Sequence, residues 1–233
     1  MTDFAGRDLV VTGGTGALGT AVVGALLARG ATVHVPWRTK AEADRFPHRG
    51  HANVRLVESE LADEGAVARL YGGIGALWGS IHIAGGFAMA PIAETDRAAF
   101  MAQIEMNLLS CFLASRAAVM ALRKTGQGGR IVNVTARPGI EPRHGAGMTA
   151  YAASKAAVAA FTQALAAEVV HEHILVNAVA PGTVDTPANR AVMPKADTSK
   201  WAQPEEVAAT ILFLASSDNR VTSGAIVPVY GRS

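Results

Sequence analysis

Tyr151 and Lys155, four residues apart in the segment YAASK, are the first candidates for chemistry. If this segment is helical, residues i and i+4 lie on one face and their side chains meet. A phenol with a pKa near 10 is a poor acid or base at pH 7, but a neighbouring ammonium group favours phenolate and lowers that pKa. Such a pair suits proton transfer to a developing alkoxide. The spacing alone is also common on helix surfaces, so the other motifs must decide between these interpretations.

A glycine-rich segment, TGGTGALG at residues 12–19, follows the strand-like run DLVVT at 8–12. Gly14, Gly16 and Gly19 fit the pattern G-x-G-x-x-G, with a helical run directly after it. Glycines let the backbone approach a pyrophosphate, and the helix N-terminus supplies free N–H groups and a positive dipole end. A plain glycine turn is the alternative. The strand–loop–helix context favours a dinucleotide site.

The end of the second expected strand bears on the choice of cofactor. Dinucleotide folds that bind NAD(H) usually place an acid here for the ribose 2′-hydroxyl. Residues 35–38 read VPWR and contain no acid. Arg38 is suited to neutralising a 2′-phosphate, so we expect NADP(H) to be favoured, with NAD(H) possible. If Arg38 is only a solvated surface charge, either cofactor would be accepted.

Short β-branched runs alternate with longer helical runs along the chain. This pattern predicts βαβ units and a parallel sheet. Helices are expected up to about residue 29 and over 63–77, 96–123, 149–170 and from 204 onward. The expected strands, the second of them stopped by Pro36, are residues 8–12, 31–35, 53–57, 80–84, 129–134, 174–180 and 225–230. The fold class is α/β: a single doubly wound Rossmann-type domain over 1–233, about seven-stranded and flanked by helices, with a short substrate lid at about 187–200.

Composition argues against several classes of protein. The 21 basic and 19 acidic residues are interspersed, which gives no clustered basic face for nucleic acid. No run reaches the roughly 18 uncharged apolar residues of a membrane span. Cys111 is the single cysteine, no signal segment is evident at the N-terminus, and no His/Cys/Asp cluster has metal-ligand spacing. A cytoplasmic protein is therefore expected, without nucleic acid, membrane or metal as a partner.

These motifs, in this order, resemble the short-chain dehydrogenase/reductase family over essentially the whole chain. The matching segments are TGGTGALG, AGG at 84–86, Asn107 in MNLLS, GRIVNV, YAASK and PGTVDT at 181–186. The resemblance implies NAD(P)(H)-dependent hydride transfer to or from a small carbonyl or alcohol. It also implies a homo-dimer or homo-tetramer, formed through the helices at 96–123 and 149–170.

The resemblance assigns roles to residues at matching positions. Tyr151 is the general acid/base, Lys155 binds the nicotinamide ribose and lowers the tyrosine pKa, and Asn107 holds a water in the proton relay. Glu60 and Leu61 flank the adenine. The remaining implied cofactor-binding residues are Gly13, Thr15, Gly16, Ala17, Leu18, Arg38, Ala84, Gly85, Pro181, Gly182, Val184 and Thr186.

One departure from the family pattern affects the chemistry. The family's catalytic serine aligns with Ala136, after Asn133-Val134-Thr135. Losing one donor to a developing oxyanion costs about 3 kcal/mol. Thr135 is adjacent and is our candidate for the replacement, although strand alternation would point it the other way. Thr149 offers another hydroxyl.

The missing serine leaves two alternatives open. Dihydropteridine reductases, a branch of the superfamily, lack that serine and reduce a quinonoid pterin. The chain resembles them locally in GGTGALG, AGG, GAGM and VDTPANRAVMPKAD at 184–197. The other alternative is a protein that binds cofactor and has lost efficient catalysis.

Overall fold

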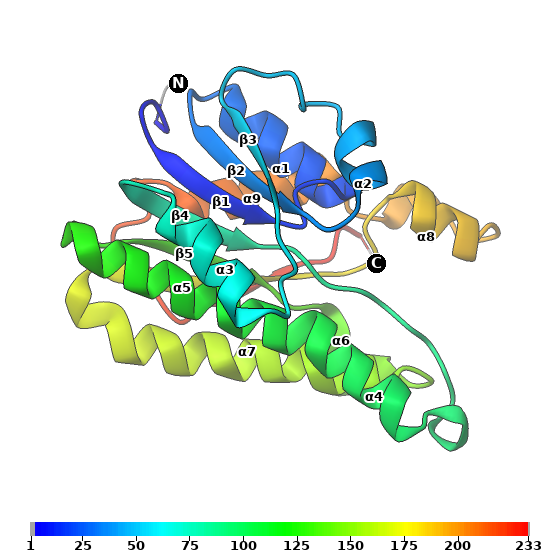
Figure 1. Cartoon of the computed structure of the whole chain (residues 1–233). Helices are drawn as coiled ribbons and strands as arrows, with labels where there is room; N and C mark the ends of the chain where they lie inside the picture. Colours follow the sequence, from blue (N-terminus) through cyan, green and yellow to red (C-terminus); the bar gives the residue numbers. More distant parts are fainter. Residues whose placement is uncertain (1–2, 233) are drawn as a thin grey trace.

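Seven parallel strands form one twisted sheet in the computed structural model, which describes residues 3–232. The strand order is β3-β2-β1-β4-β5-β6-β7, as the alternating pattern predicts for a doubly wound fold (Figure 1). The strands are β1 Asp8–Thr12, β2 Thr32–Trp37, β3 Val54–Glu58, β4 Leu77–His82, β5 Gly129–Val134, β6 Ile174–Pro181 and β7 Ile226–Val229.

Helices cover both faces of the sheet. In β1, Leu9 and Val11 pack with α1 and α9, whereas Val10 packs with α3, α5 and α7. This alternation is why the strand is apolar on both sides. The helices are α1 Ala17–Leu27, α2 Lys40–Arg45, α3 Glu64–Gly72, α4 Arg97–Gln103, α5 Ser110–Thr125, α6 Arg137–Ile140, α7 Thr149–Val169, α8 Pro187–Val192 and α9 Pro204–Ala215.

The strand order reverses between β1 and β4, because the chain moves outward from β1 to β3 and then returns to the other side. Ligands of open α/β sheets bind at the carboxyl ends of the strands beside such a switch point. The glycine loop leaves β1 there, and the loops after β4 and β5 leave the same edge. The topology thus brings together the motifs that the sequence separates by more than a hundred residues.

The main differences from the sequence prediction concern two strand boundaries and two helices. β4 begins at Leu77 because α3 already ends at Gly72. β2 continues through Pro36 to Trp37, so the predicted stop at the proline is wrong. Pairing of β2 with β1 ends at His34, so the missing N–H of Pro36 leaves no ladder bond unmade on that side.

The predicted single helix over 96–123 is interrupted. Between α4 and α5 the residues Ile104–Leu109 form a π-helical turn, in which the N–H of Ser110 bonds the carbonyl of Glu105. Such turns insert one extra residue into a helix and are frequent at functional sites. The continuous stretch Arg97–Thr125 is long and apolar enough to cross a membrane by length and composition alone, but 56% of its most apolar window is buried inside the fold.

Buried polar groups fasten α7 to the centre of the sheet. The His82 imidazole contacts the Asn133 side chain at 2.8 Å, and the Asn133 amide donates to the Thr162 hydroxyl of α7 at 2.9 Å. All three side chains are buried. Burial lowers the pKa of His82 to about 4, against a smaller opposing effect of the Asn133 hydrogen bond, so the ring is neutral at pH 7. The network fixes the helix that carries Tyr151 and Lys155.

Candidate active site

The glycine loop leaves an open cradle at the start of α1. Gly13 has a φ of +68°, and a Cβ there would lie 2.6 Å from the backbone nitrogen of Ala84. Gly16 is the N-cap of α1 and provides no side-chain cap. The first N–H groups of the helix therefore remain available to an anion. These features fit the pyrophosphate of a dinucleotide.

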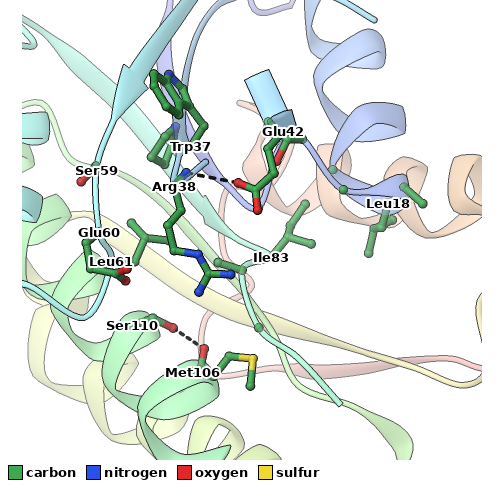
Figure 2. A pocket seen from close by; sticks show the side chains of 18 of the residues that line it. Leu18, Trp37, Arg38, Glu42, Ser59, Glu60, Leu61, Ile83, Met106 and Ser110 are labelled. Carbon is green, nitrogen blue, oxygen red and sulfur yellow. Dashed lines mark hydrogen bonds between the residues drawn. The ribbon is translucent and has the colours of Figure 1, made fainter. Parts of the chain in front are cut away.

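A cavity of about 920 Å³ extends from this cradle along the ends of β2, β3 and β4. Figure 2 shows part of its lining. The predicted cofactor-binding residues that border it are Gly13, Thr15, Gly16, Ala17, Leu18, Arg38, Glu60, Leu61, Ala84, Gly85 and Thr186. The cavity is large enough to hold most of a dinucleotide.

Arg38 brings a positive charge to this cavity just after the end of β2. Figure 2 shows the Arg38 side chain extending into the space between Leu61 and Ile83. Among the lining residues within 3–232 it is the one cation, beside three glutamates. The Glu42 carboxylate is turned to the backbone, where it accepts from the Arg38 N–H at 3.2 Å. The guanidinium thus faces the cavity beyond the end of β2.

Lys155 is buried beside the cavity, next to Gly85, and does not itself line it. Its Nζ donates to the Val134 carbonyl at 2.9 Å, and the side chain is only 5% exposed. A Cβ placed on Gly85, which borders the cavity, would be 3.3 Å from Nζ. Burial lowers the pKa of Lys155 to about 8, with Cys111 opposing this in part.

Tyr151 is covered by an aromatic neighbour. The Phe87 ring packs edge-to-face against it, with centroids 5.0 Å apart and an interplanar angle of 86°. Burial raises the pKa of Tyr151 to about 12. The expected lowering of this pKa by Lys155 is therefore not what the structure gives, because desolvation of the phenol dominates. At pH 7 the hydroxyl is protonated, which suits a proton donor.

Asn107 links three elements around the pair. Its side chain accepts from the Gly86 N–H at 2.9 Å, donates to the Gly86 carbonyl at 3.0 Å and donates to the Ser154 hydroxyl at 3.0 Å. Ser154 in turn donates to the Tyr151 carbonyl at 2.8 Å. The asparagine thus holds the loop after β4 against the first turn of α7. Asn107 lies within the π-helical turn. Its role in a proton relay stays a prediction.

The structure corrects the assignment of Thr135. Its hydroxyl donates to the Lys155 carbonyl at 2.6 Å, and the residue is buried. It therefore fastens β5 to α7 and is not free to donate to a developing oxyanion. The side chain points toward α7, as strand alternation suggests. Ala136, the position of the family's serine, is buried and carries no hydroxyl.

Only one of the four residues predicted for the nicotinamide end borders the cavity. Pro181 ends β6, the Gly182 N–H bonds the Val229 carbonyl, and Val184 forms an isolated bridge with Ala202. Thr186 borders the cavity, and its hydroxyl caps α8 by accepting from the Asn189 N–H.

An ion pair holds the base of α8. Arg190 donates through two nitrogens to the Asp185 carboxylate, and this contact lowers the pKa of Asp185 to about 2. The segment expected to act as a lid is thus attached at its first residues.

Several residues line the cavity although the sequence did not predict them there: Pro36, Trp37, Glu42, Ser59, Ala62, Ile83, Ala102, Glu105, Met106, Ser110, Pro187 and Ala188. One signal was available. Thr39 and Glu42 form a capping box, and the pattern T-x-x-E marks a helix start, so α2 and the placement of Glu42 were detectable. Met106 and Ser110 lie within and directly after the π-helical turn, which the sequence did not indicate.

A parallel sheet with a glycine cradle at its switch point and a long cavity beside it defines a dinucleotide-binding α/β oxidoreductase. The short chain dehydrogenase family model matches residues 7–197. The chain belongs to the short-chain dehydrogenase/reductase family, whose members use NAD(P)(H).

Similar proteins span nearly the whole chain. Galactitol 2-dehydrogenase of Rhizobium johnstonii is 35% identical, over 96% of this chain and 93% of its own. Cis-4-hydroxycyclohexanecarboxylate dehydrogenase of Sinomonas cyclohexanicum is 35% identical, over 98% and 96%. A short-chain dehydrogenase/reductase from Mycobacterium ulcerans has the same fold, with a TM-score of 0.90 at 24% identity, covering 98% of this chain and 90% of its own.

Proposed function

We propose that the protein interconverts a small ketone and the corresponding secondary alcohol with NAD(P)(H), and that Tyr151 is its general acid/base. The supporting observation is that Lys155 Nζ lies beside Gly85, a residue that borders the dinucleotide cavity. Tyr151 precedes Lys155 by one turn of α7. We infer that the phenol and the ammonium group act together on the substrate and the cofactor.

The bound nicotinamide cofactor would supply the hydride in reduction and accept it in oxidation. In reduction the Tyr151 hydroxyl gives its proton to the substrate oxygen as the C–O bond order falls from two to one, and solvent returns a proton to the phenolate. Lys155 would move from the Val134 carbonyl to the nicotinamide ribose. Ala136 carries no hydroxyl and the Thr135 hydroxyl is bonded to the Lys155 carbonyl, so we expect the substrate oxygen to depend mainly on Tyr151. The other candidate hydroxyl, that of Thr149, is exposed at the first residue of α7.

Of the two named relatives, one acts on a sugar alcohol and the other on an alicyclic hydroxy acid. Both substrates carry a secondary alcohol, and we propose this substrate class for the protein. The relatives do not decide between a sugar-like and an alicyclic substrate. Reduction of a quinonoid pterin and cofactor binding without catalysis stay as alternative predictions. The direct test is oxidation of NADPH and NADH in the presence of simple ketones, diketones, quinones and quinonoid pterin. Turnover of a simple ketone supports the proposal. Turnover of pterin alone, or cofactor binding with no turnover, contradicts it.

We also propose that NADP(H) is favoured over NAD(H), because the Arg38 guanidinium faces the cavity. The Arg38→Asp variant should weaken NADPH binding by roughly ten- to a hundredfold, the range of one lost hydrogen bond to a charged group. NADH binding should change less than about threefold. Titration of cofactor fluorescence measures both affinities.

Arg45→Asp, the same charge change at a residue of α2 outside the cavity lining, is the matched control. Equal weakening of both cofactors in Arg38→Asp, or equal effects of the two variants on NADPH, would show that Arg38 does not read the 2′-phosphate.

The remaining predictions fit this function. Self-association would cover the apolar surface of α5 and α7, where Phe112 and Met120 are exposed and Phe112 contacts the ring of Phe161. Residues 187–200 would close over bound substrate as part of a single domain over 1–233. A cytoplasmic location also remains a prediction.

A further inference from the structure

Phe87 packs against the ring of Tyr151. The two rings lie edge-to-face, yet 52% of Phe87 is exposed. Gly86, just before it, is held at both its N–H and its carbonyl by Asn107. The backbone is thus fixed one residue away, and the phenyl ring offers an exposed apolar surface directly beside the tyrosine.

The loop around Phe87 continues this apolar cover. A Cβ on Gly147 would lie 3.1 Å from Met89 Cε, so Met89 rests on the segment leading into α7. Ala88 and Ala90 line a small cavity of about 30 Å³ with Met148, at the N-cap of α7, and this cavity is also lined by Thr95, Gln103 and Thr149. Met89 itself is 64% exposed. The chain from 87 to 90 therefore lies over the start of the helix that carries Tyr151, and presents no hydrogen-bonding side chain.

We propose that Phe87 is a specificity-determining residue and that the substrate of this site is an apolar carbocyclic ketone or its secondary alcohol, rather than a polyhydroxylated chain. The inference rests on the proposed function, since it presumes that Tyr151 exchanges the proton. Phe87 would pack against the ring of the substrate while the carbonyl oxygen reaches the phenol.

The energetic argument concerns the hydroxyl groups of a sugar-like substrate. A hydroxyl that is buried without a hydrogen-bond partner weakens binding. Packed against Phe87 and Met89, such groups would lose water and find no side-chain partner on residues 87–90. A carbocycle instead gains from burial against the phenyl ring.

The test compares cyclohexanone with a linear ketopentose as substrates of the wild-type protein and of Phe87→Ala, Phe87→Leu and Ile92→Ala. Ile92 is the control, because it lies on the same connection and is 73% exposed. The wild type should prefer cyclohexanone in kcat/KM by roughly thirtyfold or more, the effect of about 2 kcal/mol. Phe87→Ala should raise KM for cyclohexanone roughly tenfold and change that for the ketopentose by less than about threefold. Phe87→Leu should be intermediate, and Ile92→Ala should match the wild type.

The pH profile of alcohol oxidation shows whether Phe87 acts on Tyr151 itself or whether its replacement only disturbs the loop. Water admitted by Phe87→Ala should lower the pKa of Tyr151 in the pH profile of alcohol oxidation, whereas Ile92→Ala should leave the profile unchanged. Equal or better turnover of the ketopentose by the wild type overturns the inference alone, as does an equal effect of Phe87→Ala on both substrates. Absence of turnover with every ketone, despite cofactor binding, overturns both the inference and the proposed function.

Discussion

Replacing Tyr151 with phenylalanine should lower kcat for ketone reduction by roughly 10²- to 10⁴-fold, the usual contribution of a positioned general acid. The variant removes one oxygen and keeps the ring that packs against Phe87, so folding and the cofactor cavity should be preserved. The effect should be near the upper end of this range because Ala136 offers no hydroxyl to share the developing charge, and Thr135 is bonded to the Lys155 carbonyl.

The measurement is steady-state cofactor oxidation beside a fluorescence titration of cofactor on the same preparation. Unchanged cofactor affinity with lost turnover places the defect in the chemical step. Because the pKa of Tyr151 is about 12, its phenol stays protonated from pH 6 to 9. The rate of ketone reduction by the wild type should therefore show no change with pH in this range that is due to Tyr151. A fall above pH 8 would belong to Lys155, whose ammonium group loses its proton near that pH. Activity of Tyr151→Phe within about threefold of wild type would contradict the assignment.

Gly19→Ala should damage both stability and cofactor binding. A Cβ at this position would overlap the carbonyl oxygen of Gly13 and lie 2.6 Å from the Cα of Gly14. Both neighbours are backbone, so relief requires α1 to move away from the loop. Overpacking of this kind costs about 1–3 kcal/mol, or roughly 2–4 °C in Tm for each kcal/mol in a chain of this size. A displaced cradle should also weaken cofactor binding roughly tenfold or more, as expected when a charge-assisted hydrogen bond is lost.

Gly72→Ala provides the matched control for this substitution. Gly72 ends α3, and a Cβ there would meet nothing within 4 Å. The change should leave cofactor affinity intact and raise stability by about 0.5–1 kcal/mol through the better helix propensity of alanine. Thermal unfolding and cofactor titration of the two variants test the pair. Similar behaviour of both would mean that the contact between α1 and the loop is not as close as the structure has it.

The sequence predicted the structure best in segments where the local pattern has a direct physical cause that the fold preserves. The alternation of strands and helices predicts the parallel sheet, and the glycines predict the cradle, because each has a direct steric reason. Pro36 misled the prediction, since its effect depends on whether β1 still pairs with β2 at that point. The π-helical turn could not be predicted, because the segment 96–123 has uninterrupted helical character and the interruption comes from packing.

For the site, position in the chain predicted which residues approach the cofactor cavity, and eleven of them border it. Orientation was harder to predict. The sequence placed a hydroxyl at Thr135 without showing that the Lys155 carbonyl binds it. It predicted an ammonium group beside Tyr151, but burial raises the pKa of the phenol, and one of the groups packed against its ring is Phe87, 64 residues away in the chain. Such effects arise from tertiary contacts that no local pattern records.

The π-helical turn at Ile104–Leu109 allows one helix to serve two surfaces that face different directions. Each residue of an α-helix advances the side chains by about 100° around the axis, so the extra residue changes the phase of everything after it. The cofactor cavity is bordered by Ala102, Glu105 and Met106, before and within the turn, and by Ser110 directly after it, whereas Leu113 and Ala114 further along pack in the core beside the sheet. A regular helix of the same length would keep one of these alignments and rotate the other away. Protein engineers who shorten or regularise this segment would therefore have to choose between core packing and the cofactor wall.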